Sequence, residues 1–103
     1  MYYEDYIPKR LAQLRQLKKV SARDMSLSLG QSENYINMIE NRKSLPSMSA
    51  FFLILDYLGA TIQEFFDEEN PNPEAMHELL NTLNKLDGED LTLIQTLAHR
   101  MVK

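Results

Sequence analysis

Hydrophobic residues recur at helical spacing from the beginning of the chain. Ile7, Leu11, Leu14 and Leu17 are four, three and three residues apart, which predicts a helix with one apolar face. Pro8 falls near the start of this stretch, and a helix tolerates proline in its first turn because the missing N–H has no partner there. We therefore expect the first helix to begin close to Ile7.

Two short helices are predicted next, separated by a turn of about three residues. Ser21 precedes an acid by three residues, which predicts the N-cap of a second helix that runs to Leu29 and ends at Gly30. Ser32 predicts the N-cap of a third helix that reaches Asn41. The glycine permits the positive φ angle that a tight connection between two helices needs.

Two more helices complete the first part of the chain. Pro46–Ser47 interrupts the helical pattern, and a fourth helix is predicted to run from there to Gly59. Its apolar stripe is formed by Met48, Phe51, Phe52, Leu55 and Leu58. Thr61 and Glu64 have the spacing of a capping box that opens a fifth helix ending at Phe65–Phe66. We assign the pairs Phe51–Phe52 and Phe65–Phe66 to the hydrophobic core rather than to a ligand pocket.

The segment 67–73 is polar and contains two prolines, which indicates a boundary between residues 1–70 and a tail of residues 71–103. The tail carries two apolar stripes on either side of a turn at Asp87–Gly88, which predicts a helical hairpin. The stripes are Met76, Leu79, Leu80, Leu83 and Leu86, then Leu91, Ile94, Leu97, Ala98 and Met101. Because two helices cannot bury both stripes, the hairpin must pack on the five-helix body or on a second chain.

Charge is distributed unevenly along the 103 residues. Residues 1–67 contain eight Lys or Arg and eight Asp or Glu, whereas residues 68–103 contain three against seven and supply the whole net charge of −4. The cations form two blocks that flank the central short helices: Lys9, Arg10, Arg15, Lys18, Lys19 and Arg23, then Arg42 and Lys43. The first part is therefore electrostatically separate from the acidic tail, and its basic blocks are compatible with a nucleic-acid partner.

Two short helices joined by a glycine-containing turn meet the requirement for a helix-turn-helix, in which the second helix enters the DNA major groove. Residues 10–66 resemble the phage-repressor and Cro-like helix-turn-helix family at a spaced set of positions: Arg15, Leu29, Gly30, Ser32, Tyr35, Ile36, Ile39, Glu40, Asn41, Pro46, Ser47, Leu58, Gly59, Phe65 and Phe66. The resemblance implies a five-helix, lambda-repressor-like DNA-binding domain. Together with the helical hairpin predicted from the two apolar stripes, it makes the expected fold all-α.

By this resemblance residues 25–29 form the positioning helix and residues 32–41 the recognition helix. Asn34 and Asn37 carry side-chain amides that donate and accept together, as the reading of adenine requires. Glu33 can accept from cytosine N4, and Met38 can touch a thymine methyl group. These four residues are the expected base contacts.

Residues that flank the recognition helix are expected to contact phosphates: Arg23, Ser32, Tyr35, Arg42, Lys43 and Ser44. The resemblance further implies that Arg15 on the first helix pairs with Glu40 and supports the recognition helix. Arg42 stands where the family usually has glycine, so we expect it in a left-handed conformation at a cost of about 1 kcal/mol.

The function predicted from these features is sequence-specific binding of double-stranded DNA by a homodimer, as a transcriptional repressor on a palindromic operator. The expected dimerisation residues lie on the hairpin stripes: Leu79, Leu83, Leu86, Leu91, Ile94 and Leu97. Net acidity and Glu33 leave one alternative, a protein-interaction module such as an antitoxin-like or anti-regulator subunit on the same fold.

Other classes of function lack the residues they need. The chain has no cysteine and no nucleophile or phosphate-loop motif, so we expect neither an enzyme nor a cofactor. His77 and His99 have no acidic or cysteine partners at ligand spacing, and no metal is expected. The longest apolar run, from Phe51 to Leu55, is too short for a membrane, and the start has no signal-peptide pattern, so a cytoplasmic location is expected.

Overall fold

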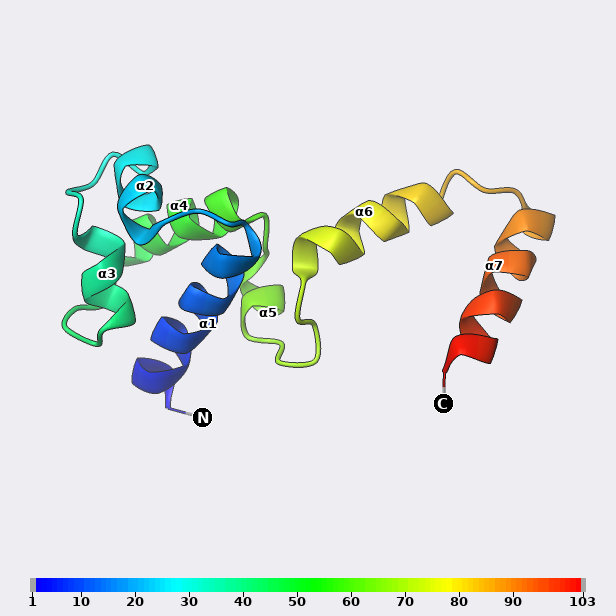
Figure 1. The fold of residues 1–103 in the computed structure, drawn as a ribbon, viewed down its shortest axis with the longest axis horizontal. Helices are drawn as coiled ribbons and strands as arrows, with labels where there is room; N and C mark the ends of the chain where they lie inside the picture. Colours follow the sequence, from blue (N-terminus) through cyan, green and yellow to red (C-terminus); the bar gives the residue numbers. More distant parts are fainter. Residues whose placement is uncertain (1, 103) are drawn as a thin grey trace.

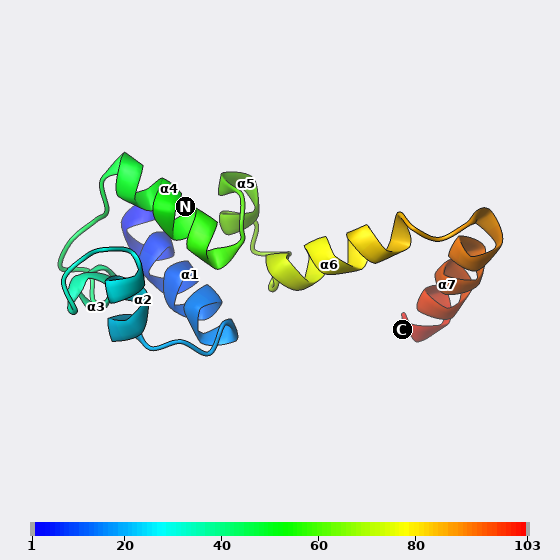
Figure 2. The same ribbon diagram turned by 90° about the horizontal axis from the view of Figure 1, so that it is seen from above.

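The computed structural model describes residues 2–102, which form seven helices and no strand (Figure 1). The helices are α1 (Tyr3–Leu17), α2 (Ala22–Ser28), α3 (Tyr35–Glu40), α4 (Met48–Leu58), α5 (Ile62–Phe65), α6 (Pro73–Leu83) and α7 (Gly88–Met101). Helices α1 to α5 gather into a body, and α6 and α7 extend away from it as an arm (Figures 1 and 2). The radius of gyration is accordingly 16.9 Å, against about 13 Å for a compact chain of this length.

The body has one hydrophobic core to which α1 to α5 all contribute. Its buried apolar residues are Tyr6, Leu11, Leu14, Met25, Ile36, Ile39, Phe51, Ile54, Leu55, Leu58 and Phe65. The all-α architecture predicted from helical periodicity is confirmed. Helices α2 and α3 lie at the end of the body remote from α6, so the arm and this helix pair occupy opposite ends of the molecule (Figures 1 and 2).

Most helix boundaries follow the predicted capping residues. The hydroxyls of Ser21 and Ser47 accept main-chain N–H groups at the starts of α2 and α4. Thr61 and Glu64 form the complete capping box of α5. Gly59 ends α4 with a φ of 69°, in the left-handed region that favours glycine.

The start of the first helix was predicted wrongly. Helix α1 begins at Tyr3, and Pro8 lies inside it rather than in its first turn. Contacts across the core hold the extra turn, because the hydroxyl of Tyr6 donates to the carbonyl of Phe65 at 3.0 Å and the ring of Tyr3 packs edge-on against Phe66 at 5.6 Å. These partners are distant in sequence and do not enter a local helical pattern.

The fourth helix turns a different face inward from the one predicted. Phe51 is buried and its ring packs edge-on against Phe65 with centroids 5.2 Å apart, as expected of core residues. Phe52 and Met48, however, are 47% and 67% exposed, so their assignment to the buried stripe is wrong. Ile54 takes the inward position instead, because it lies three residues after Phe51 on the same helical face.

Arg10 belongs to the first basic block of the sequence but is only 2% exposed. Its Nε donates to the carbonyl of Phe65 at 2.8 Å. Its Nη2 donates to three more carbonyls, those of Glu64 (2.8 Å), Asp67 (3.1 Å) and Asn70 (2.7 Å). Arg10 therefore fastens α1 to the end of α5 and to the segment that follows, and it is not on the surface to meet another molecule.

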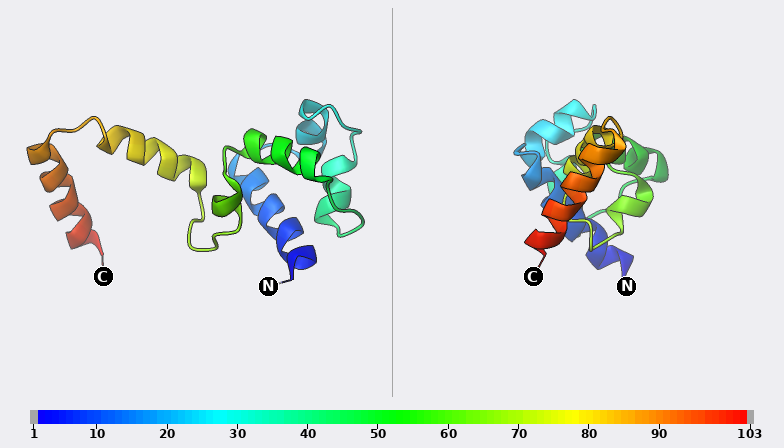
Figure 3. Two further views of the ribbon diagram at one scale, coloured as in Figure 1. Left: turned by 180° about the vertical axis from the view of Figure 1, so that it is seen from behind. Right: turned by 90° about the vertical axis from the view of Figure 1, so that its right-hand side faces the viewer.

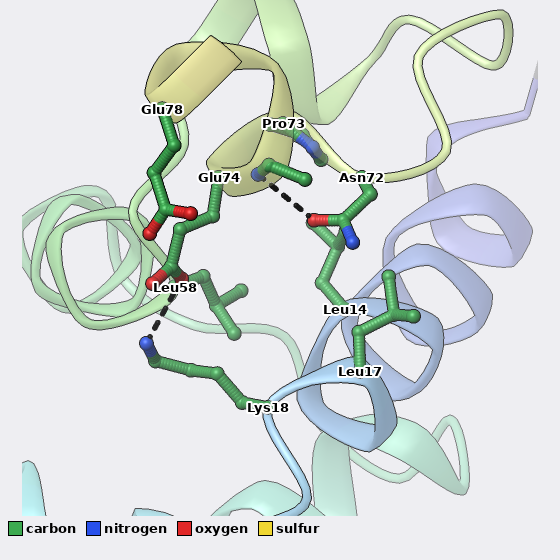
Figure 4. Close-up of a pocket in the computed structure, with 9 residues that line it drawn as sticks. Leu14, Leu17, Lys18, Leu58, Asn72, Pro73, Glu74 and Glu78 are labelled. Atoms are coloured by element: carbon green, nitrogen blue, oxygen red, sulfur yellow. Dashed lines mark hydrogen bonds and ion pairs between the residues drawn. The ribbon is translucent and has the colours of Figure 1, made fainter. Parts of the chain in front are cut away.

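The base of the arm packs on the body. Pro73 is buried, Lys18 Nζ lies 3.1 Å from Glu74 Oε2, and His77 Nε2 lies 2.6 Å from Glu64 Oε2. Figure 4 shows the Lys18–Glu74 pair beside a cavity of about 370 Å³ between the body and α6. The first turn of α6 is thus held by the body, although it follows the proline-containing segment that indicated a boundary.

Beyond this base, none of residues 74–102 is buried. Helix α6 ends at Leu83 and α7 begins at Gly88, so the predicted turn at Asp87–Gly88 is misplaced. Asp87 is instead the N-cap of α7, where its carboxylate accepts the N–H of Asp90 at 2.8 Å. The two helices diverge instead of lying side by side (Figures 1 and 3), and both apolar stripes face solvent in the single chain.

Candidate nucleic-acid interface

Helices α2 and α3 are joined by a turn whose first part follows the prediction. Gly30 has a φ of 73°, and the N–H of Gln31 donates to the carbonyl of Ser26 at 3.0 Å to close the end of α2. The second part differs, because Ser32 does not cap α3. Its main-chain carbonyl, rather than its hydroxyl, accepts the N–H of Tyr35 at 3.0 Å. Residues 32–34 therefore form a turn, and α3 is a helix of six residues that begins at Tyr35.

Helix α3 has one buried and one exposed face. Ile36 and Ile39 are both 0% exposed and anchor the helix in the core. The side chains predicted to contact bases are all exposed, on α3 and on the turn before it: Glu33, Asn34, Asn37 and Met38. The helix therefore presents polar groups outward from a rigid apolar base.

Asn41, which was not among the expected base or phosphate contacts, bonds to one of these side chains. Its Nδ2 donates to Oδ1 of Asn37 at 2.9 Å and to the Asn37 carbonyl at 2.8 Å. Within residues 2–102 no hydrogen bond engages Nδ2 of Asn37, and the side chain is exposed, so this donor is open to solvent. The sequence signal was an identical amide four residues further on, which places it on the same helical face.

Arg15 and Glu40 form the ion pair expected between the first and third helices. Nε of Arg15 donates to Oε2 of Glu40 at 2.7 Å and Nη2 donates to Oε1 at 3.0 Å, with the side chains only 15% and 12% exposed. Hydrogen bonding to Glu40 raises the pKa of Arg15, outweighing the lowering by burial. Arg15 Nη1 also donates to the carbonyl of Val20 at 2.8 Å. This bidentate pair fixes α3 against α1 and against the connection to α2.

Two cations expected to meet phosphate have carboxylate partners within the chain. Arg23 Nε lies 3.2 Å from Glu33 Oε2, and Arg42 Nε lies 3.2 Å from Asp5 Oδ1. All four side chains are more than half exposed, and exposed pairs of this kind contribute little free energy. Both arginines can therefore exchange these partners for an external anion at small cost.

The remaining phosphate candidates lie around α3 at different depths. Ser32 and Lys43 are exposed, whereas Tyr35 and Ser44 are half-buried. The Tyr35 hydroxyl is protonated and able to donate at neutral pH, and burial raises its pKa further above the ordinary value of 10.0. Arg42 has a φ of 62°, which confirms the left-handed conformation predicted for it.

Neither a metal-binding cluster nor a membrane-crossing helix is present in the part of the chain that the structure describes. Among residues 2–102, no three histidine, aspartate or glutamate side chains gather closely enough to hold a metal ion. In this same range, no helix combines the length and apolarity needed to cross a bilayer.

Comparison with known proteins identifies the region that carries this geometry. A family model described as helix-turn-helix matches residues 11–65, slightly more than half of the chain. The matched residues run from α1 to α5 and include the Arg15–Glu40 pair, the Gly30 turn and the exposed face of α3. Searches of curated proteins and of solved structures gave no match.

Proposed function

The chain belongs to the phage-repressor and Cro-like helix-turn-helix family of DNA-binding transcription regulators, and we propose that it acts as a dimeric repressor on a palindromic operator. The observation that carries the proposal is the geometry of α3. It is held from behind by two fully buried isoleucines and by the Arg15–Glu40 pair, and it turns polar side chains outward. A short rigid helix of this kind can enter the major groove without reorganisation.

In this proposal the exposed face of α3 and the turn before it read the bases. Asn34 and Asn37 donate to and accept from adenine, Glu33 accepts from cytosine N4, and Met38 contacts a thymine methyl group. Asn41 supports the assignment of Asn37, because it fixes the amide before DNA arrives. A prepositioned side chain loses less conformational freedom on binding.

The backbone of the duplex is bound by groups that surround α3: Arg23, Ser32, Tyr35, Arg42, Lys43 and Ser44. Arg23 and Arg42 leave their weak internal pairs when phosphate replaces Glu33 and Asp5. This exchange also frees the carboxylate of Glu33 to face a base. The phosphate and base contacts are therefore coupled through the Arg23–Glu33 pair.

The arm is proposed to join two chains. Leu79, Leu91, Ile94 and Leu97 are 40–50% exposed in the single chain. The other members of the proposed interface, Leu83 and Leu86, are half-buried. Each fully buried leucine contributes about 1.5–3 kcal/mol, so a two-fold arrangement of two arms has ample driving force. Residues 1–70 would then form the DNA-binding unit and residues 71–103 the dimerisation unit, with the packed base of α6 as the joint.

A protein-interaction module on the same fold is the second candidate. It is favoured by the two internal pairs that neutralise Arg23 and Arg42 and by the net charge of −4, since both reduce attraction to DNA. This candidate predicts a stable domain that binds a protein partner and has no preferred DNA sequence.

Selection from fragmented genomic DNA at low salt separates the two candidates. The repressor predicts enrichment of two inverted half-sites about one helical turn apart, and weaker transcription in a cell-free assay from a promoter that overlaps the enriched site. The double variant Arg42→Gln/Lys43→Gln serves as the control and should enrich no site while remaining folded. Enrichment of no sequence by the unchanged chain would favour the interaction module.

A further inference from the structure

Ser26, in the middle of α2, connects three parts of the helix-turn-helix. It is 0% exposed, and its hydroxyl accepts the main-chain N–H of Ile36 in α3 at 2.9 Å. The same hydroxyl donates to the carbonyl of Ala22 at 2.7 Å, which fixes its orientation. Its main-chain carbonyl accepts the N–H of Gln31, in the turn, at 3.0 Å. One small residue thus bonds to its own helix, to the turn and to the next helix.

The bond to Ile36 supplies a hydrogen-bond acceptor that the start of α3 lacks. The first N–H groups of a helix have no acceptor within the helix, and a side chain at the N-cap usually provides one. Asn34 at the N-cap of α3 makes no such bond. Ser26, which lies on α2, provides the acceptor instead, at a buried position. This bond matters because a helix of only six residues, such as α3, has little stability of its own.

We propose that Ser26 is a positioning residue for DNA recognition: its hydroxyl sets the placement of α3 relative to α2. The proposal rests on the proposed reading of bases by Asn34 and Asn37, which flank Ile36 on either side. If the hydroxyl is removed, the N–H of Ile36 is left buried without an acceptor, and α3 must shift to reach water. That shift moves both amides, whereas phosphate contacts from flexible side chains adapt to it.

The test compares Ser26→Ala with Ser28→Ala in the full chain. Ser28 lies on the same helix, is exposed and forms no side-chain hydrogen bond within residues 2–102, so its variant makes the same chemical change without touching α3. Affinity is measured for the selected operator and for an unrelated duplex of equal length. Ser26→Ala should weaken operator binding about threefold to tenfold and leave the unrelated duplex unchanged. Ser28→Ala should change neither affinity.

Amide exchange of the free protein gives a second measurement. The N–H of Ile36 should exchange faster in Ser26→Ala than in the unchanged chain, while core amides on α4 keep their protection. If Ser26→Ala is unfolded, Ser26→Cys is used instead; its thiol has nearly the same shape and is a weaker acceptor, so an intermediate loss of discrimination is expected.

An unchanged ratio of operator to unrelated affinity in the folded variant would overturn the positioning role. Equal binding of both duplexes by the unchanged chain would instead overturn the proposed function. In that case the exchange rate of the Ile36 N–H still tests the role of Ser26 separately. Equal exchange rates in the unchanged chain and in Ser26→Ala would overturn that role.

Discussion

The imidazole Nε2 of His77 lies 2.6 Å from Oε2 of Glu64, so one carboxylate serves both the capping box of α5 and the base of the arm. Burial raises the pKa of Glu64, but hydrogen bonds to Thr61 and the interaction with His77 lower it by more, and the net pKa lies below its ordinary value of 4.5. A carboxyl group whose pKa is lower in the folded state stabilises that state above the unfolded pKa. This contribution is lost as pH falls below 4.5 and through the lowered folded value.

Glu64→Gln should therefore lower the free energy of unfolding at pH 7, by less than about 1 kcal/mol because the contact between Glu64 and His77 is partly exposed. Glutamine keeps an oxygen for the N–H of Thr61, so the capping bond survives, whereas the charge and the oxygen that faces His77 are lost. The difference from the unchanged chain should shrink as pH falls below 4.5 and vanish in strong acid. Denaturant titrations across this range measure it, with Glu69→Gln, at an exposed glutamate, as the control. A difference that persists unchanged in acid would contradict the assignment.

Glu40→Ala should lower stability by about 2–3 kcal/mol, because it leaves the largely buried guanidinium of Arg15 without its partner. The matched control is Glu33→Ala, which breaks the exposed pair with Arg23 and should cost less than about 1 kcal/mol. Thermal unfolding of the two variants at equal pH measures both. Equal Tm values would show that the Arg15–Glu40 pair does not support α3.

Asn37→Ala should change the preference at one base position by about 1–3 kcal/mol and leave the others unaltered. Lys43→Gln should instead weaken binding to every sequence and reduce the slope of log affinity against log salt by about 1. Binding measured over a panel of single-base operator variants at several salt concentrations separates the two effects. Uniform weakening by Asn37→Ala would place Asn37 among the phosphate contacts.

Ile94→Asp should convert the proposed dimer to a monomer, since a carboxylate cannot be buried unpaired in an apolar interface. Thr96→Asp adds the same charge two residues away, on the other side of α7, and should leave the dimer intact. Sedimentation of the full chains measures the association. The monomeric variant should keep its affinity for one half-site and lose the added affinity for two. A dimer that survives Ile94→Asp would locate the interface elsewhere.

Arg42→Gly should raise stability by up to about 1 kcal/mol, because glycine adopts a φ near 62° without strain. It should at the same time weaken DNA binding through the loss of a cation. Arg42→Ala is the comparison, since it removes the charge but keeps the strain. If both variants have the same free energy of unfolding, the left-handed conformation is not costly at this position.

Local rules account for the parts of the fold that could be predicted from the sequence. Ser21, Ser47 and the Thr61–Glu64 box act on main-chain groups within three residues, and Gly59 acts on its own φ angle. The same kind of rule failed at Ser32, because a competing bond from its own carbonyl already engages Tyr35. A capping residue is therefore informative only when no other acceptor reaches the same N–H.

The features that could not be predicted depend on contacts between distant segments. Ser26 has an ordinary place in the helical pattern, and only its position opposite the start of α3 gives its hydroxyl a role. The early start of α1 depends in the same way on the packing of Tyr6 against Phe65. Among the site residues, the exposed polar face of α3 could be predicted from helical periodicity. The carboxylate partners of Arg23 and Arg42 could not, because ion pairs between exposed side chains leave no pattern in the sequence.

The burial of Arg10 has a consequence for the order in which the molecule forms during synthesis. Its four carbonyl partners lie 54 to 60 residues further along the chain, and the last of them, at Asn70, is made only after all of α1 to α5. Until then Arg10 lacks its full set of carbonyl acceptors, and the segment after α5 is not fastened to α1. The body can close once Asn70 has left the ribosome, while the leucines of the arm are still inside the exit tunnel. The growing polypeptide thus completes its core before its most exposed apolar segment appears.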